Sequence, residues 1–315
     1  MTIHKIAFVF PGQGSQSIGM MSTFGEHPVV RRTFDEASEV LGEDLWQLAA
    51  EGPEEKLALT TYTQPLMLTA DVAVWRAWCA TTDVRSVVVA GHSLGEYAAL
   101  VAAGALDLRD AVPLVRFRAQ AMQEAVPEGV GAMAAILGLD DEQVIALCEA
   151  ESRADHCVEA VNFNSPGQVV IAGHKIAVET LMEKAKEAGA KRAVLLPVSA
   201  PFHSSLLKPA ASRLRERLAD VTFKVPQIRL LHNVDVAEHR DQNGIREALA
   251  TQAARPVRWT ETMQAMVKEG VTHIVECGPG KVLAALAKRS APGVENMALI
   301  SSEAIEKTAR ALATE

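Results

Sequence analysis

The sequence has few of the features that mark secreted, membrane-spanning or nucleic-acid-binding proteins. It has four cysteines in 315 residues and no Cys-x-x-Cys pair, which argues against a disulfide framework and indicates a reducing compartment. No apolar run approaches the roughly 18 residues that a membrane helix needs. The formal net charge is −8, which argues against nucleic acid or an anionic membrane as the main partner. We expect a cytoplasmic protein with neither partner.

Two other absences narrow the class of protein. The N-terminal residues Met1 to Lys5 lead directly into an apolar, strand-like segment, so we expect no signal peptide. The nine histidines include no His-x-x-x-His pair of the kind that binds zinc on a helix, so we expect no metal site. Hydrophobic residues make up 49% of the chain and charged residues 22%. That balance is typical of a globular domain.

Short apolar segments alternate with helical ones along the chain. Residues 6–10 and, after Ser86, 87–90 of the expected strand 86–90 are continuously apolar and are followed by glycine-containing turns, a pattern typical of strands buried on both faces of a parallel sheet. Residues 29–80 read as helical, with a turn at Gly52-Pro53 and a break near Pro65. Further strands are expected at 228–233 and 273–276, and further helices at 96–105, 206–218, 259–269 and 281–289.

The middle of the chain has a pattern of its own. Strands are expected at 132–139, 157–163, 168–172 and 192–198, and helices at 140–151 and 175–188. This β-α-β-β-α-β order is the ferredoxin-like arrangement. The sequence therefore predicts a ferredoxin-like subdomain over 128–198, inserted into an α/β core formed by 1–127 and 199–315.

The segment Gly91-His92-Ser93-Leu94-Gly95 matches G-x-S-x-G between a predicted strand and a predicted helix. In that context the serine is a candidate nucleophile on a strained turn, at a helix end whose free N–H groups can stabilise an oxyanion. A tight turn with an N-capping serine is the alternative interpretation.

A serine nucleophile needs a base. His203 lies in a loop directly after the last predicted strand of the inserted unit, and reactive groups gather in such loops. His92 adjoins Ser93, but neighbouring side chains on such a turn point apart, so His92 is better placed to support the loop. Spacing alone leaves the choice among the histidines open.

The loop after the first strand also has two interpretations. Gly12 and Gly14 nearly complete G-x-G-x-x-G, with Asp35 about twenty residues on, as in a dinucleotide site. The third glycine is replaced by Ser17, however, and Pro11 occupies the turn. The competing hypothesis is that this loop supplies a backbone N–H facing Ser93.

Six segments together carry a family resemblance. They are FPGQGSQ (10–16), GHSLGE (91–96), NFNSPGQVVIAG (162–173), APFHS (200–204), PVRW (256–259) and ECGPGKVL (276–283). In this order they resemble the malonyl-CoA:acyl carrier protein transacylases of bacterial fatty acid synthesis. The resemblance covers nearly the whole chain. It implies an α/β-hydrolase-like core with a ferredoxin-like insert, and transfer of malonyl from malonyl-CoA to the phosphopantetheine thiol of acyl carrier protein.

The resemblance also implies residue roles. Ser93 would be the nucleophile, His203 its base, and the backbone N–H groups of Gln13 and Leu94 the oxyanion hole. Arg118 would bind the malonyl carboxylate, because a guanidinium fork pairs with a carboxylate in a dry pocket. Local sequence alone does not separate Arg118 from Arg116 two residues away.

Four further positions follow from the same resemblance. Gln252 would orient His203 through its backbone carbonyl, although the following Ala-Ala-Arg departs from the usual Asn before PVRW. Phe202 would crowd an α-methyl branch and so favour malonyl, and Asn162 and His92 would line the substrate site. The resemblance implies no cofactor, and we expect a monomer whose partners are malonyl-CoA and acyl carrier protein.

Three other functions stay open on the sequence alone. The closest is an acyltransferase of polyketide synthesis, with the same chemistry and another carrier. A serine hydrolase usually has an acid between its serine and histidine in chain order, and a carrier-binding module would have no catalysis at all. Because acyl carrier proteins are acidic, a docking patch of basic residues is expected; the candidates are Lys191, Arg192, Lys208, Lys288 and Arg289.

Overall fold

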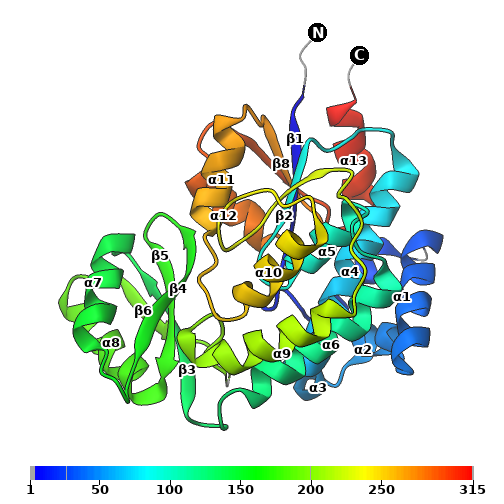
Figure 1. Cartoon of the computed structure of the whole chain (residues 1–315). Coiled ribbons are helices and arrows are strands. Elements are labelled where there is room, and N and C mark those ends of the chain that lie inside the picture. Colours follow the sequence, from blue (N-terminus) through cyan, green and yellow to red (C-terminus); the bar gives the residue numbers. More distant parts are fainter. Residues whose placement is uncertain (1–3, 26, 199, 314–315) are drawn as a thin grey trace.

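The computed structural model describes residues 4–25, 27–198 and 200–313, and these form two β-sheets with helices around them (Figure 1). Met1, Thr2 and Ile3 of the predicted N-terminal segment, and Ser199, with which the second part of the predicted core begins, lie outside the described residues. No helix in the described part of the chain is both long enough and apolar enough to cross a membrane.

The larger sheet is parallel, with the strand order β7-β2-β1-β8-β9. Its strands are β1 (Ile6–Phe10), β2 (Val88–Gly91), β7 (Arg229–Leu231), β8 (His273–Glu276) and β9 (Glu295–Ala298). Alternate residues of β1 enter different cores, Phe8 and Phe10 on one face and Ala7 and Val9 on the other. Both faces of the sheet are therefore buried, as the continuous apolar runs predict.

Helices cover both faces of this sheet. One face carries α11 (Trp259–Lys268) and α12 (Val282–Ser290). The other core is built with α1 (Pro28–Leu41), α2 (Leu45–Glu51), α3 (Glu54–Ala58), α4 (Thr60–Thr81), α5 (Gly95–Ala102), α6 (Leu108–Glu124), α9 (Lys208–Ala219), α10 (Gln242–Gln252) and α13 (Ser302–Leu312). Short 3-10 helices lie at Ser22–Phe24 and Ser205–Leu207.

The smaller sheet is antiparallel, with the order β4-β5-β3-β6. It consists of β3 (Gly131–Leu137), β4 (Val158–Ser165), β5 (Gln168–His174) and β6 (Arg192–Leu195), with α7 (Asp141–Glu151) and α8 (Lys175–Glu187) packed on one face. Figure 1 shows this unit beside the larger one. The β-α-β-β-α-β order and the mixed α/β fold class are confirmed; the boundaries of the inserted unit at 128 and 198 stay a prediction.

The predicted break near Pro65 is wrong, because α4 continues through it. Pro65 lies early in the helix, where few backbone hydrogen bonds are lost, and the following residues are almost all buried. Burial of an entire helix outweighs the one bond that a proline removes. The helices α6, α10 and α13 and the strand β9 were not among the predicted elements. Strand β9 is only partly buried, so it lacks the apolar run that marked the other strands of its sheet.

Candidate active site

The turn after β2 holds Ser93 in a strained backbone conformation. Its φ is +51°, in the left-handed region that residues with a side chain rarely adopt. The flanking glycines permit the turn: a Cβ on Gly91 would clash with the backbone of Gly95, and a Cβ on Gly95 would clash with the carbonyl of Phe10. The predicted strand–turn–helix context of G-x-S-x-G is therefore present, with Ser93 directly before α5.

His203 faces Ser93 from the loop that follows the four-stranded sheet. Its Nε2 lies 2.7 Å from Ser93 Oγ, and its Nδ1 lies 2.7 Å from the backbone carbonyl oxygen of Gln252. Because a carbonyl can only accept, Nδ1 carries the proton and the Nε2 lone pair faces the hydroxyl. Burial, and then the Arg118 guanidinium, lower the pKa of His203 to about 3. The imidazole is therefore neutral at physiological pH and can take a proton.

The Arg118 guanidinium lies beside the same hydroxyl and is 1% exposed. Its Nη2 donates to Ser93 Oγ at 3.1 Å and to Gln252 Oε1 at 2.9 Å, and its Nη1 donates to Gln64 Oε1 at 2.7 Å. In the described part of the chain, these hydrogen-bond partners of Arg118 are all neutral. Burial lowers the pKa of Arg118. The groups around the guanidinium therefore do not fully compensate its positive charge for the loss of water. Such a site favours an anion.

Arg116 lies elsewhere. Its guanidinium donates to both carboxylate oxygens of Glu43, at 3.0 and 3.1 Å, and stacks over Tyr62. Two residues on a helix are about 200° apart, so only one of the two arginines can face the core. Leu114 and Met122, one turn before and after Arg118, are both buried. This apolar face was a usable signal in the sequence.

A cavity of about 180 Å³ opens in front of Ser93. It lies between the carboxyl ends of β1 and β2 and the inner face of the four-stranded sheet. Its lining combines polar groups with an apolar wall: Gln13, Gln64, His92, Ser93, Leu94, Arg118, Met122, Met133, Asn162, Asn164, Val170, Leu196, Val198, Phe202 and His203.

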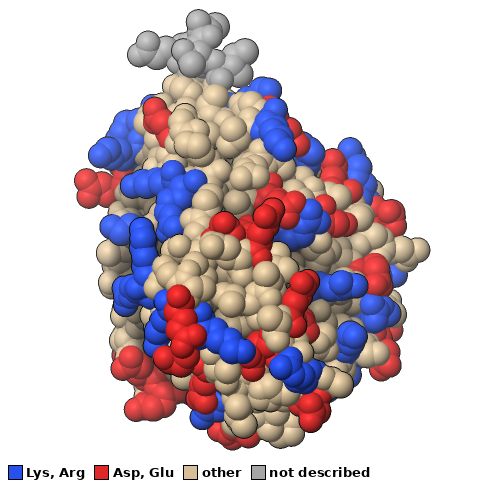
Figure 2. Space-filling model, turned by 90° about the vertical axis from the view of Figure 1, so that its left-hand side faces the viewer, with Lys and Arg blue, Asp and Glu red and all other residues tan. Residues whose placement is uncertain are grey.

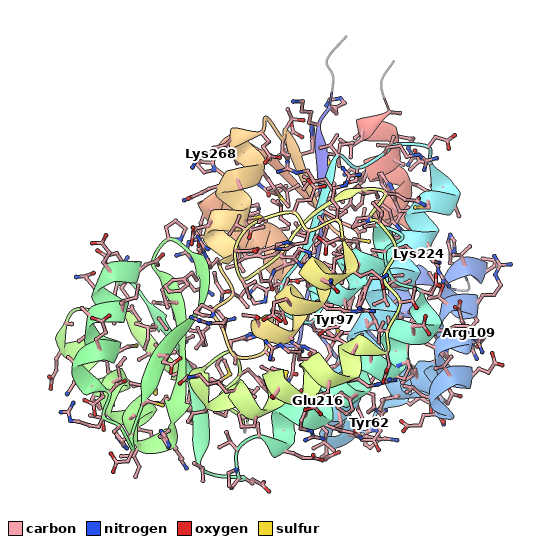
Figure 3. The ribbon with its side chains drawn as sticks, in the orientation of Figure 1. Tyr62, Tyr97, Arg109, Glu216, Lys224 and Lys268 are labelled. Carbon is pink, nitrogen blue, oxygen red and sulfur yellow. The ribbon has the colours of Figure 1, made fainter. Side chains whose placement is uncertain are left out.

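In Figure 3 the buried Tyr97 lies in the interior, whereas the exposed Lys268, Arg109 and Lys224 lie at the periphery.

The loop after β1 lies against the Ser93 turn. A Cβ on Gly12 would come within 2.6 Å of the His92 carbonyl oxygen and 3.7 Å of the Leu94 nitrogen. Among the described residues no acceptor is recorded for the backbone N–H of Gln13 or of Leu94, and both residues line the cavity. Two free donors at this position can stabilise an oxyanion.

The dinucleotide interpretation of this loop is wrong. A dinucleotide site needs the glycine loop to open directly into a helix whose N-terminus binds the pyrophosphate. Here a 3-10 turn at Ser22–Phe24 is the first helical element after β1, and α1 begins only at Pro28.

The remaining predicted residues also reach the cavity. His92 Nε2 lies 2.7 Å from Asn164 Oδ1, and its ring packs edge-on against Trp259. Burial lowers the pKa of His92, so the ring is neutral. Asn162 is buried, and Phe202 packs between the two sheets. The structure thus brings together all nine residues singled out in the sequence.

Several polar residues near Ser93 were not predicted. Gln64 binds Arg118, and Glu96, His232 and Asn233 form a fully buried cluster with Gln252 beside the Ser93 turn. Glu96 gave one signal: it is a carboxylate in a run of Ala and Leu that otherwise reads as a buried helix.

Comparison with known proteins agrees with this geometry. The model of the acyl transferase domain family matches residues 7–307. The malonyl CoA-acyl carrier protein transacylase of Salmonella typhimurium is 53% identical over 286 residues, which is 90% of this chain and 92% of that protein.

Two solved structures are also similar. An acyl-carrier-protein S-malonyltransferase from Burkholderia pseudomallei is 58% identical, with a TM-score of 0.95 over 97% of this chain and 99% of that one. A malonyl-transacylase in complex with a type II PKS acyl-carrier protein is 48% identical, with a TM-score of 0.94 over 97% and 98% of the two chains. The chain belongs to the acyl transferase domain family and, within it, to the malonyl CoA-acyl carrier protein transacylases.

Proposed function

We propose that this protein transfers the malonyl group from malonyl-CoA to the phosphopantetheine thiol of acyl carrier protein, in fatty acid biosynthesis. The observation that carries the proposal is the buried guanidinium of Arg118, which lies 3.1 Å from Ser93 Oγ and has only neutral partners among the described residues. A malonyl thioester differs from an acetyl thioester by one carboxylate. Bound at Ser93, it would give Arg118 an anion in direct contact, which its hydrogen-bond partners do not supply.

The residues around Ser93 support a two-step transfer. His203 Nε2 takes the proton from Ser93 Oγ, which attacks the thioester carbonyl carbon. The N–H groups of Gln13 and Leu94 hold the oxyanion. The carbon–sulfur bond then breaks, His203 returns the proton to the departing CoA sulfur, and a malonyl-serine ester remains. The carrier thiol loses its proton to His203 and reverses the same steps.

Two competing functions are less well supported. In a Ser-His-Asp hydrolase a carboxylate binds the histidine, whereas His203 here bonds a backbone carbonyl of Gln252. A module that only binds a carrier needs no serine in a strained turn, because such strain persists where function requires it. A carrier from polyketide synthesis remains the closest alternative, since one similar structure holds such a carrier.

A label-and-chase experiment tests the function. The protein is incubated with radioactive malonyl-CoA, isolated, and chased with acyl carrier protein from fatty acid synthesis, with a polyketide carrier, or with buffer. We expect a stable label that moves to the fatty acid carrier. Rapid loss in buffer would indicate a hydrolase, preference for the polyketide carrier would indicate the alternative pathway, and the absence of label would indicate a binding module.

Replacing His203 with alanine should slow malonyl transfer by about 10²–10⁴-fold, the usual contribution of a general base. The variant keeps Ser93 and Arg118, so binding of malonyl-CoA should change much less than the rate. Single-turnover labelling at saturating malonyl-CoA measures this rate. His92→Ala is the comparison, since His92 bonds Asn164 and not Ser93. A larger loss in His92→Ala than in His203→Ala would make His92 the base.

Part of the predicted basic patch is contiguous. Arg289 donates to the carbonyl oxygen of Pro166 at 2.8 Å and to Gln168 Oε1 at 3.1 Å, at the turn between β4 and β5. A backbone carbonyl of the same turn accepts a hydrogen bond from the Gly138 N–H, and Lys191 packs against Gly138. Figure 2 shows positive side chains gathered along the left half of the face that includes the smaller unit. We propose that acyl carrier protein docks here. Because Arg289 holds the turn, Lys288 is the cleaner position to change.

Reversing the charge in Lys288→Glu should raise KM for acyl carrier protein several-fold and leave KM for malonyl-CoA unchanged, because rim charges act mainly on the association of charged partners. Steady-state kinetics with each substrate varied in turn measures both constants. Lys307→Glu, an equally exposed change on α13, is the control. An equal rise in both constants would indicate that Lys288 contacts a CoA phosphate.

We further propose that the protein acts as a monomer in the cytoplasm. Ser93, His203 and Arg118 bond one another within one chain, so the proposed transfer does not require a catalytic residue from a second subunit. The four cysteines are free thiols, which suits a reducing compartment.

A further inference from the structure

The carboxylate of Glu96 is the only acidic group in the buried cluster beneath Ser93. Glu96 lies in the first turn of α5 and is fully buried. Its Oε2 accepts the backbone N–H of Asn233 at 2.9 Å and Gln252 Nε2 at 3.1 Å. Its Oε1 lies 2.7 Å from His232 Nδ1. All these contacts are to donors, so the carboxylate is satisfied without reaching the cavity.

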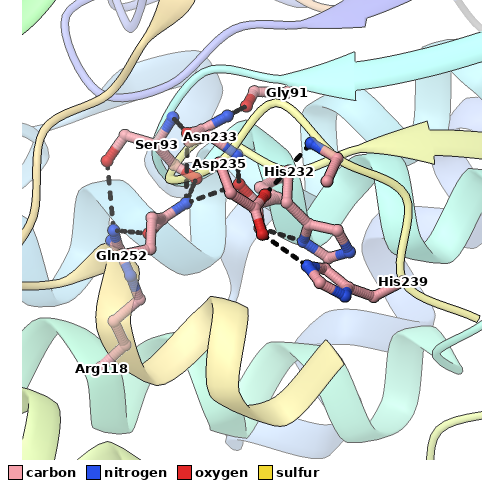
Figure 4. Close-up of polar contacts among 10 residues, drawn as sticks. Gly91, Ser93, Arg118, His232, Asn233, Asp235, His239 and Gln252 are labelled. Atoms are coloured by element: carbon pink, nitrogen blue, oxygen red, sulfur yellow. Dashed lines mark hydrogen bonds and ion pairs between the residues drawn. The ribbon is translucent and has the colours of Figure 1, made fainter. Parts of the chain in front are cut away.

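The side chains of the two residues that Glu96 binds, Asn233 and Gln252, also hold the backbone of the nucleophile turn (Figure 4). Asn233 Oδ1 accepts the Ser93 N–H at 2.8 Å, and Asn233 Nδ2 donates to the Gly91 carbonyl at 2.7 Å. Gln252 Nε2 donates to the Ser93 carbonyl at 2.9 Å. A left-handed serine persists only where its surroundings hold it in place. These side chains are what hold it.

Glu96 is one of the groups that fix which way the Gln252 amide points. Three acceptors surround Gln252 Nε2: the Ser93 carbonyl, Glu96 Oε2 and Asn233 Oδ1. Its Oε1 is therefore left to accept from Arg118 Nη2 at 2.9 Å. A flipped amide would set an oxygen against the carboxylate and an NH₂ group against the guanidinium.

Gln252 thus forms hydrogen bonds with all three functional residues. Its side chain touches Ser93 and Arg118, and its backbone carbonyl accepts from His203 Nδ1 at 2.7 Å. A group that orients Gln252 therefore acts on the nucleophile and the base together.

We propose that Glu96 is a positioning residue for acyl transfer, whose carboxylate holds the Asn233 backbone and the Gln252 side-chain amide and through them keeps Ser93 and His203 in reactive geometry. The inference rests on the proposed function and deepens it. In a Ser-His-Asp triad the acid binds the histidine itself. Here the acid acts one residue further away, because the Gln252 carbonyl stands between it and His203.

The test is Glu96→Gln, which keeps the volume but removes the charge and one acceptor. We expect single-turnover acylation of Ser93 to slow about 10–100-fold, the range in which small misplacements reduce rates. The loss should be equal for malonyl-CoA and acetyl-CoA, because both acyl groups need Ser93 and His203. KM for malonyl-CoA and Tm should change little.

Glu276→Gln on β8 is the matched control. This carboxyl is also fully buried, and its Oε2 accepts the Ala284 N–H, away from the cavity. Burial raises the pKa of Glu276 to about 7, so an amide resembles its neutral form. The control should keep the wild-type rate. If Glu96→Gln does not fold, the isosteric Asn233→Asp, which replaces the donor to Gly91 with an oxygen, should show the same equal loss.

Three outcomes would overturn the inference: unchanged acylation rates, a loss confined to malonyl-CoA, or a lower Tm with an unchanged rate per folded molecule. The second would make Glu96 only a distant counter-charge of Arg118, and the third would make it only structural. Wild-type protein measured in parallel distinguishes failure of the proposed malonyl transfer from failure of the positioning role of Glu96. A wild type that takes no malonyl label overturns the proposed function and this inference with it, whereas a labelled wild type alongside an equally fast Glu96→Gln overturns this inference alone.

Discussion

Replacing Ser93 with alanine is expected to abolish the covalent malonyl adduct and to lower the rate of transfer by at least about 10⁴-fold, in line with removal of the nucleophile in a serine enzyme. No other hydroxyl is recorded within hydrogen-bond distance of the His203 ring in the described chain. The substitution adds no atoms, and alanine meets the same left-handed backbone as serine. The fold should therefore persist.

Intact-protein mass spectrometry after incubation with malonyl-CoA measures the adduct, and Tm reports the fold. Ser86→Ala is the control, because Ser86 Oγ bonds the carbonyl oxygens of Ile6 and Val88 at the far end of β2. That variant should label like the wild type. An adduct that still forms on Ser93→Ala would mean that another residue is the nucleophile.

Replacing Arg118 with alanine should damage malonyl transfer severely and acetyl transfer little. Leaving one member of a buried charge pair unpartnered costs about 2–5 kcal/mol, or roughly 30- to several thousand-fold in rate. Acetyl-CoA has no carboxylate to pair, and its neutral acyl group no longer meets a buried guanidinium. Acetyl transfer should therefore hold or even improve.

The control is Arg116→Ala, since Arg116 pairs with Glu43 outside the cavity. Single-turnover rates of both variants with both thioesters give the result. The carboxylate-binding role stands only if the change in selectivity falls on Arg118 alone. Equal losses for both thioesters would make Arg118 a structural residue, and a change in selectivity in Arg116→Ala would transfer the role to Arg116.

These two variants differ from Glu96→Gln in a way that separates the roles. Ser93→Ala removes the chemistry, Arg118→Ala changes the choice of acyl group, and Glu96→Gln slows both acyl groups alike.

Much of the local structure could be predicted from the sequence because it depends on neighbouring residues. The continuous apolar run of β1, the glycines on either side of Ser93 and the acidic N-cap of α7 each act within a few positions. Local signals of the same kind indicated the β-α-β-β-α-β order of the smaller unit. Where a local rule failed, as at Pro65, burial of the whole helix outweighed it.

The composition of the site depended on contacts between distant parts of the chain. Gln252 and Ser93 are 159 positions apart, and Asn233 and Ser93 are 140 apart. No pattern within one segment encodes which buried amide will face which carbonyl; packing of α10 and of the loop after β7 against the Ser93 turn decides it. Local sequence patterns were sufficient for most of the strands and for the nucleophile turn, and the family resemblance supplied the candidate catalytic pair and Arg118. The tertiary structure showed Arg116 bound to Glu43 outside the cavity and placed Glu96 beneath Ser93, because hydrogen bonds of buried polar groups are satisfied across the fold and not along the chain.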